Sequence, residues 1–206
     1  MPLFPESRGA LVLVVDDDAA VRDSLALLLR SAGYAAAVRP SAEALLEDLP
    51  AEAGCLIADI RMPGGLDGIA LLEALRQRGR FLPTIIVTGH GDVPLAVRAM
   101  KAGAADFIEK PYEDTAILAA VGTALASRPA PDAARAAALR QIGLLSPRER
   151  EVLEGLVAGK LNKIIAHELG ISPRTVEVHR ANVMEKLGTG SLSATVRLAL
   201  QAGIGL

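Results

Sequence analysis

Acidic and basic side chains stand where several short apolar segments of this sequence end. The apolar segments have the composition of buried strands, and the residues at or just after their ends are Asp16, Asp17, Asp18, Asp59, Thr88 and Lys110. Clustered carboxylates suit Mg²⁺, a hard cation that prefers oxygen ligands. A carboxylate beside such an ion can act as a nucleophile toward a phosphoryl group, whose oxygens an ammonium and a hydroxyl would stabilise. If the fold brings these residues together, the chemistry they support is phosphoryl transfer to a carboxylate.

Each of these residues also has an ordinary explanation when taken alone. An acidic triplet is common at the start of a helix, where it interacts favourably with the helix dipole. Asp59 alone could be a turn residue, and Lys110 before Pro111 could face solvent. Their combination, each at a strand end, favours a shared pocket over these separate explanations.

The elements that would position these residues follow from the hydrophobic pattern. Apolar runs predict strands at 11–15, 35–38, 56–58, 84–88 and around 107–108. Helical spacing predicts helices around 25–29, 45–49 and 71–75, and at 93–102 and 115–126, with Asp92 as the N-cap of the fourth. Alternation of this kind predicts an α/β fold with a five-stranded, parallel, doubly wound (flavodoxin-like) sheet. The carboxyl ends of its strands should lie together at one edge.

The second half of the sequence has a different character. Residues 1–127 carry 11 basic and 17 acidic residues, a net charge of −6, whereas residues 128–206 carry 11 and 7, a net charge of +4. We therefore expect a first domain at 1–127, a linker at 128–140 whose second part can be helical, and an all-α domain at 141–206. Ser146-Pro147-Arg148-Glu149 has the pattern of a capping box at a helix start.

Composition also limits the class of protein. Hydrophobic residues make up 51% of the 206 residues, enough for two cores. There is a single cysteine, Cys55, and no apolar run approaches the roughly 18 residues of a membrane span. No secretory signal is apparent near Met1. These features predict a cytoplasmic protein with no membrane partner.

Residues 164–187 have the pattern of a helix-turn-helix, with Gly170 in the turn and Pro173 opening the second helix. At about 100° per residue, Val176, Val183 and Leu187 share one face of that helix. The opposite face could lie in the major groove of double-stranded DNA, or the helix could equally be an ordinary surface helix. The predicted DNA contacts are Arg174, Thr175, Glu177, Val178 and Ala181 near base edges, and Lys163, Arg180 and Lys186 at phosphates.

Glu177 leaves two interpretations open, because an acid on a reading helix repels phosphate. It either accepts from a cytosine amino group or anchors Arg180 or Arg174; base reading is slightly favoured.

The first half resembles the receiver domains of two-component systems over about residues 10–126. The resemblance is carried by Val14-Val15-Asp16-Asp17-Asp18, Asp59-Ile60-Arg61-Met62-Pro63, Thr88-Gly89-His90-Gly91-Asp92 and Phe107-Ile108-Glu109-Lys110-Pro111. It implies that Asp59 is the phosphoacceptor. It also implies that Mg²⁺ is held by Asp16, Asp17, Asp59 and the Arg61 carbonyl. Thr88 and Phe107 would be switch residues, and Lys110 the phosphate-binding cation.

The second half resembles the LuxR-type DNA-binding domain over about residues 141–203. The motifs are Leu145–Leu153, Asn162–Ala166, Ile171–Arg180 and Lys186-Leu187-Gly188. The order of the two domains resembles the FixJ subfamily of response regulators. The resemblance implies phosphorylation by a sensor histidine kinase, dimerisation when phosphorylated, and binding to promoter DNA. It further implies action on RNA polymerase, as an activator, and no enzyme activity beyond the receiver's own phosphorylation and dephosphorylation.

Two further expectations concern the receiver. Four residues, Gly64-Gly65-Leu66-Asp67, separate Pro63 from Gly68 where the receiver pattern has three. The Arg61 carbonyl precedes this extra residue, but the shape of the loop is open. The predicted dimer face is formed by Val97, Lys101 and Asp106.

Three rival interpretations fit less well. A haloacid-dehalogenase-type phosphatase would need its nucleophile after the first strand rather than the third. A small-molecule-sensing regulator would need a ligand cavity, often lined by aromatic residues, and the chain has no Trp. A receiver that acts as a fixed dimeriser without phosphate is disfavoured because every pocket residue is present.

Overall fold

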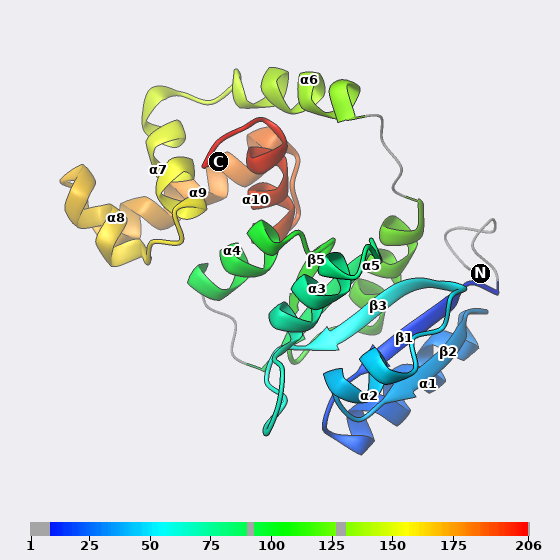
Figure 1. Ribbon diagram of the computed structural model, residues 1–206. Helices are drawn as coiled ribbons and strands as arrows, with labels where there is room; N and C mark the ends of the chain where they lie inside the picture. The colour runs from blue at the N-terminus through cyan, green and yellow to red at the C-terminus, as the bar shows by residue number, and fades with distance from the viewer. Residues whose placement is uncertain (1–8, 90–92, 127–130, 206) are drawn as a thin grey trace. The chain divides into compact units, whose positions relative to one another are not determined.

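The computed structural model describes residues 9–89, 93–126 and 131–205. Within the chain, two compact units can be distinguished, and each is described by itself (Figure 1). The first contains the described residues from 9 to 89 and from 102 to 126, and the second contains those from 93 to 101 and from 131 to 205. The Asp92 N-cap and the start of the predicted linker at 128 lie outside the described residues.

The first unit is built on a parallel sheet of order β2-β1-β3-β4-β5. The strands are β1 (Leu11–Val15), β2 (Ala35–Arg39), β3 (Ala53–Asp59), β4 (Thr84–Thr88) and β5 (Asp106–Glu109). The helices of this unit are α1 (Ala19–Ser31), α2 (Ala42–Glu47), α3 (Gly68–Gln77) and α5 (Asp114–Ala126). Helix α4 (Val93–Ala102) lies between β4 and β5 in the chain, but its residues up to Lys101 are grouped with the second unit. This architecture confirms the predicted five-stranded, parallel, doubly wound fold.

The core of this unit explains why β1, β3 and β4 read as apolar runs. Val12 and Val14 of β1 pack with Leu25 and Leu29 of α1 and with Ile117 of α5 on one face of the sheet. Successive side chains of a strand point to opposite faces, so Leu13 and Val15 face the other side. These four of the five β1 residues are at most 1% exposed, as expected of a strand covered on both faces.

The second unit contains a helical core, as predicted. Its helices after α4 are α6 (Pro131–Ile142), α7 (Pro147–Val157), α8 (Asn162–Leu169), α9 (Pro173–Leu187) and α10 (Leu192–Gln201). The capping box at Ser146 is present in full, with Ser146 and Glu149 bonding to each other's backbone N–H. Val183 and Leu187 of α9 are buried against α7 and α10, and Val176 packs on α7 and α8.

The predicted linker differs from the structure in one respect. Residues 131–142 are helical, and Ala138 and Ile142 belong to the helical core of the second unit. The alanine-rich stretch carried too little apolar periodicity to show that its end is packed.

Candidate functional site

The predicted strand-end residues lie at one edge of the sheet because all five strands run in parallel. Asp16 directly follows β1, Asp59 is the last residue of β3, and Lys110 directly follows β5. Backbone hydrogen bonds to β4 align the ends of β3 and β5 along the strand direction. The Lys110 N–H donates to the Thr88 carbonyl at 2.7 Å, and the Ile60 N–H donates to the Val87 carbonyl at 3.0 Å. We call Asp16, Asp59 and Lys110 the acidic pocket.

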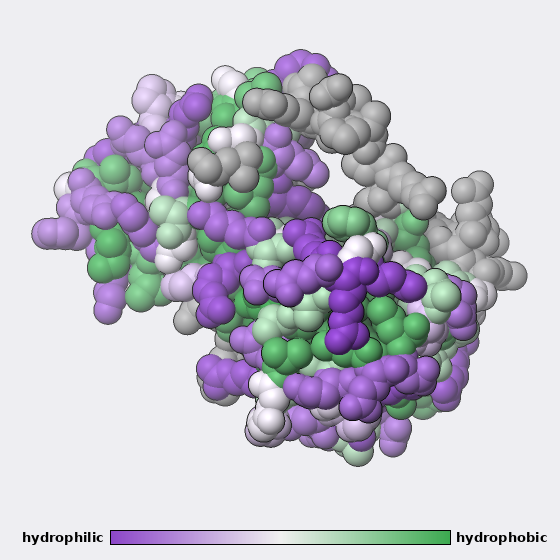
Figure 2. Space-filling view, in the orientation of Figure 1, coloured by the Kyte–Doolittle hydropathy of each residue, from purple (hydrophilic) through white to green (hydrophobic). Residues whose placement is uncertain are grey.

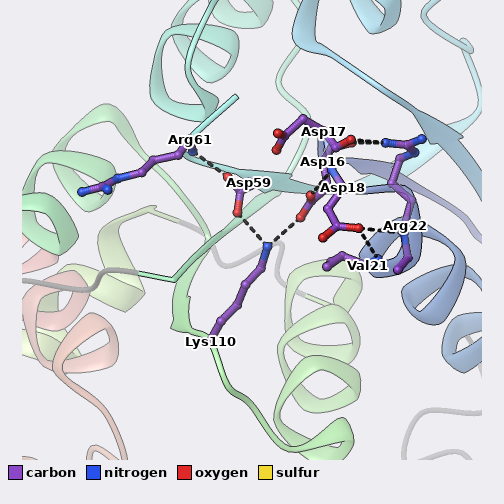
Figure 3. A network of polar contacts seen from close by, with 9 residues as sticks. Asp16, Asp17, Asp18, Val21, Arg22, Asp59, Arg61 and Lys110 are labelled. Carbon is purple, nitrogen blue, oxygen red and sulfur yellow. Dashed lines mark hydrogen bonds and ion pairs between the residues drawn. The ribbon is translucent and has the colours of Figure 1, made fainter. Parts of the chain in front are cut away.

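The three side chains of the acidic pocket point toward one another (Figure 3). The Lys110 Nζ lies 2.7 Å from Asp16 Oδ2 and 2.8 Å from Asp59 Oδ1. Asp16 is 3% exposed and Asp59 6%, so both carboxylates are buried against a single ammonium. Such a pair of buried carboxylates is stable only when a cation compensates their charge.

The electrostatics of the pocket follow from burial and from this ammonium. Burial raises the pKa of the Asp59 carboxyl, and the hydrogen bond and charge of Lys110 oppose that rise. Burial by itself lowers the pKa of Lys110, but its bonds to Asp16 and Asp59 outweigh this effect and leave the pKa raised. Lys110 therefore stays positively charged at neutral pH.

The three residues of the acidic triplet take different positions. Asp16 lies in the pocket, whereas Asp17 is exposed. Asp18 is the N-cap of α1, where its Oδ1 accepts from the Ala20 N–H at 2.8 Å. The helix-start explanation thus holds for Asp18, and the pocket explanation holds for Asp16.

A residue that the sequence did not single out, Arg22, fixes this turn. Its Nη1 donates to the carbonyls of Asp16 at 2.7 Å and Asp17 at 2.9 Å. The sequence does carry a signal for this role of Arg22. It is a basic residue about one turn into the helix that follows the acidic triplet.

The other receiver residues take the following positions. Arg61 is exposed and its side chain extends away from the pocket, while its backbone N–H donates to Asp59 Oδ2 at 2.6 Å (Figure 3). Thr88 is completely buried and Phe107 is half-buried. Of the predicted dimer face, Val97 is 3% exposed, Lys101 is exposed and Asp106 is half-buried.

The donor chemistry of the pocket fits Mg²⁺, although no cluster of ligands is preassembled. Within residues 9–89, 93–126 and 131–205, no group of three or more His, Cys, Asp or Glu side chains is placed to hold a metal ion. Two buried carboxylates with a third, Asp17, beside them and the Arg61 backbone nearby still supply the oxygen ligands that Mg²⁺ prefers.

The predicted DNA-contact residues lie on α9 and α8. On α9 the exposed residues are Arg174, Glu177, Val178, Ala181 and Lys186, and the half-buried ones are Thr175 and Arg180. Val178 is 53% exposed. Lys163 is exposed on α8.

Two of the predicted phosphate contacts have partners inside the domain. Lys186 Nζ lies 2.7 Å from Oε2 of Glu149, which is 4% exposed. Arg180 Nη1 donates to Asn162 Oδ1 at 3.0 Å. The sequence pattern does not reveal Glu149 as a partner, because the ion pair joins residues 37 positions apart.

Comparison with known proteins identifies both halves. Residues 12–122 match the family described as "Response regulator receiver domain", and residues 143–199 match "Bacterial regulatory proteins, luxR family". The chain belongs to the FixJ-like response regulators. It is therefore a transcriptional regulator of the two-component type, with a receiver and a LuxR-type DNA-binding domain.

The relatives resemble the chain over nearly its whole length. It is 54% identical over 205 residues to the transcriptional regulatory protein FixJ of Azorhizobium caulinodans, covering 98% of this chain and 96% of the relative. It is 52% identical over 199 residues to FixJ of Bradyrhizobium diazoefficiens, covering 94% and 96%. The crystal structure of full-length FixJ from B. japonicum matches with a TM-score of 0.55 and 50% identity, covering 95% of this chain and 98% of that one.

In the part of the chain that the structure describes, no helix has the length and apolar character needed to cross a membrane.

Proposed function

We propose that this response regulator is phosphorylated on Asp59 by a sensor histidine kinase and then activates transcription in the cytoplasm. One observation carries this proposal. The buried Asp59 carboxylate ends the central strand β3, receives the Arg61 N–H at 2.6 Å, and faces the Lys110 ammonium at 2.8 Å. A carboxylate held in this way can present an oxygen to a phosphoryl donor, and the adjacent Lys110 ammonium can stabilise the negative charge of the phosphoryl oxygens.

Mg²⁺ would be held in the pocket by Asp16, Asp17, Asp59 and the Arg61 carbonyl. When bound, the ion would neutralise the charge that develops on the transferring phosphoryl oxygens. The Lys110 ammonium would then leave Asp59 and contact the phosphate. The receiver would also react with a small phosphodonor and later hydrolyse the acyl phosphate, so it would catalyse its own phosphorylation and dephosphorylation.

The phosphate would act on the rest of the receiver through Thr88 and Phe107. Thr88 ends β4, the strand beside β3, and its hydroxyl would turn toward the phosphate, with Phe107 of β5 following. The face carrying Val97, Lys101 and Asp106 would then bind a second copy. A switch from 1:99 to 99:1 requires the phosphate to favour the active state by about 5.5 kcal/mol.

The dimer would bind promoter DNA with two copies of α9 and act on RNA polymerase. Arg174, Glu177, Val178 and Ala181 would read base edges, with Thr175 beside them. Lys163, Arg180 and Lys186 would contact phosphates. The four proposed base-reading residues are exposed, whereas Val176 on the opposite face is buried, and this supports their assignment to the DNA-facing side of α9. An inverted pair of half-sites is the expected operator, because a symmetric dimer binds a pseudo-palindrome.

The first experiment is phosphate incorporation from a small phosphodonor with Mg²⁺, followed by intact-protein mass spectrometry. Asp59→Asn should take up no phosphate because the nucleophilic carboxylate is gone. Asp67→Asn is the matched control: Asn also caps helices, so the α3 start should persist and labelling should match wild type. Phosphate on Asp59→Asn at the wild-type level would rule out this acceptor.

A further inference from the structure

The loop that follows the phosphoacceptor is one residue longer than the receiver pattern, and the structure fixes both of its ends. At its start, the Arg61 N–H donates to Asp59 Oδ2 at 2.6 Å. At its end, Asp67 Oδ1 caps α3 by accepting from the Ala70 N–H at 2.7 Å, and the Gly68 N–H donates to the Ile60 carbonyl at 3.2 Å. The extra residue therefore has to be accommodated between these two anchors.

The middle of the loop is held by Glu43, a residue from another element. Glu43 lies in the first turn of α2, 23 positions away, and its Oε1 accepts from the Leu66 N–H at 2.7 Å. The Leu66 N–H is also the main cause that lowers the pKa of the Glu43 carboxyl below its ordinary value.

The neighbouring residue, Gly65, lies directly against this carboxylate. A Cβ added at Gly65 would overlap the Glu43 carboxylate, with Cδ at 2.7 Å and Oε2 at 2.8 Å. Gly65 is not among the glycines with positive φ, so space rather than backbone conformation disfavours a side chain there. The carboxylate thus occupies the volume that a residue at position 65 would otherwise fill.

We propose that Glu43 is a positioning residue for the phosphoacceptor site, holding the lengthened loop so that the Arg61 backbone stays against Asp59. The proposal rests on the proposed function in that Arg61 supplies a carbonyl ligand and Asp59 takes the phosphate. An exposed hydrogen bond contributes little to global stability. Its effect here is local, because it restrains a glycine-containing segment between two anchored ends. Partners that orient metal ligands typically change metal affinity by about 10–100-fold when removed, and Glu43, one step further out, should change it by about threefold.

The test compares Glu43→Ala, Glu43→Gln and Gly65→Ala in the full-length chain, with Glu47→Ala as a control on the same helix. The readouts are exchange of the Leu66 amide hydrogen, Mg²⁺ affinity of the unphosphorylated protein by calorimetry, and Tm. Glu43→Ala should speed Leu66 exchange and weaken Mg²⁺ binding about threefold, with Tm nearly unchanged. Glu43→Gln keeps an acceptor oxygen and should restore both values.

Gly65→Ala should reproduce the effects of Glu43→Ala by pushing the carboxylate away. A double variant that carries both Glu43→Ala and Gly65→Ala has no Glu43 carboxylate for the new Cβ to overlap. Adding Gly65→Ala to Glu43→Ala should therefore change the readouts little. Unchanged Leu66 exchange in Glu43→Ala would overturn the proposal, as would faster exchange with unchanged Mg²⁺ affinity. Both readouts are independent of phosphate transfer, so a failure of Asp59 to accept phosphate would be recognised separately.

Discussion

At the scale of single residues, Glu149 links the start of α7 to the end of α9. Its carboxylate accepts from the Ser146 N–H at 2.8 Å and from Lys186 Nζ at 2.7 Å. Lys186 and the Ser146 N–H together lower the pKa of Glu149 from 4.5 to about 2. A lowered folded-state pKa stabilises the fold above the unfolded value, and this contribution is lost as pH falls from about 4.5 to about 2.

Glu149→Gln should therefore remove part of the acid sensitivity of the helical domain. Gln at this position can still reach back to the N-cap N–H, so the variant changes the charge more than the cap. Urea unfolding followed by circular dichroism at several pH values should show a smaller loss of stability between pH 4.5 and 2 than in wild type. Glu154→Gln, an exposed position on the same helix, serves as the control, and equal pH slopes for all three proteins would contradict this role for Glu149.

The ion pair between Lys186 and Glu149 predicts that Lys186 and Lys163 contribute differently to DNA affinity. The Lys186 ammonium is already 2.7 Å from the buried Glu149 carboxylate, which partly compensates its positive charge, so its attraction to a DNA phosphate should be weaker. Lys163→Ala should reduce the slope of log affinity against log salt by roughly 1, and Lys186→Ala by clearly less. Lys186→Ala should also lower the stability of the domain, because it leaves Glu149 buried without its cation. Equal slopes for the two variants, measured by fluorescence anisotropy, would show that Lys186 contacts phosphate as fully as Lys163.

At the scale of elements, the turn between α8 and α9 depends on Gly170. This residue has φ 65 in the left-handed region, and a Cβ added to it would meet nothing within 4 Å. Gly170→Ala should therefore lower the free energy of unfolding by about 1 kcal/mol through backbone strain alone. Gly170→Asn should lose less, since Asn tolerates this conformation better. Thermal unfolding measures both, and equal losses for Ala and Asn would show that strain is not the cause.

The elements show why some features could be predicted from the sequence and others could not. β1 and β4 are covered on both faces, so their apolar runs marked both ends of each strand correctly. β3 begins at Ala53, three residues before its predicted start at 56, because Ala53 and Gly54 carry little apolar signal. The juxtaposition of Asp16, Asp59 and Lys110 followed from the parallel sheet, since each stands at a carboxyl end.

Side-chain pairs between distant elements could not be predicted in the same way. The bonds from Glu43 to Leu66 and from Lys186 to Glu149 join residues of different helices and loops. No periodicity in a single segment encodes such contacts. They depend on how the elements pack, which the sequence pattern leaves open.

At the scale of the whole molecule, an acidic receiver of charge −6 is joined to a basic helical domain of charge +4. A single domain of that charge, with one short reading helix, should bind DNA weakly. Two copies joined through their receivers gain a high effective local concentration, and affinity rises without any new contact. Figure 2 shows polar residues spread over the visible face of both units, with apolar areas between them.

The most direct measurement selects DNA duplexes from a random pool with the full-length protein, phosphodonor and Mg²⁺. Affinity for the selected duplex is then measured for phosphorylated wild type, untreated wild type and treated Asp59→Asn. We expect a pseudo-palindromic sequence that phosphorylated wild type binds about a hundredfold more tightly than either of the others. Equal affinity in all three samples, or selection of a single half-site, would contradict the proposal that phosphate on Asp59 controls DNA binding.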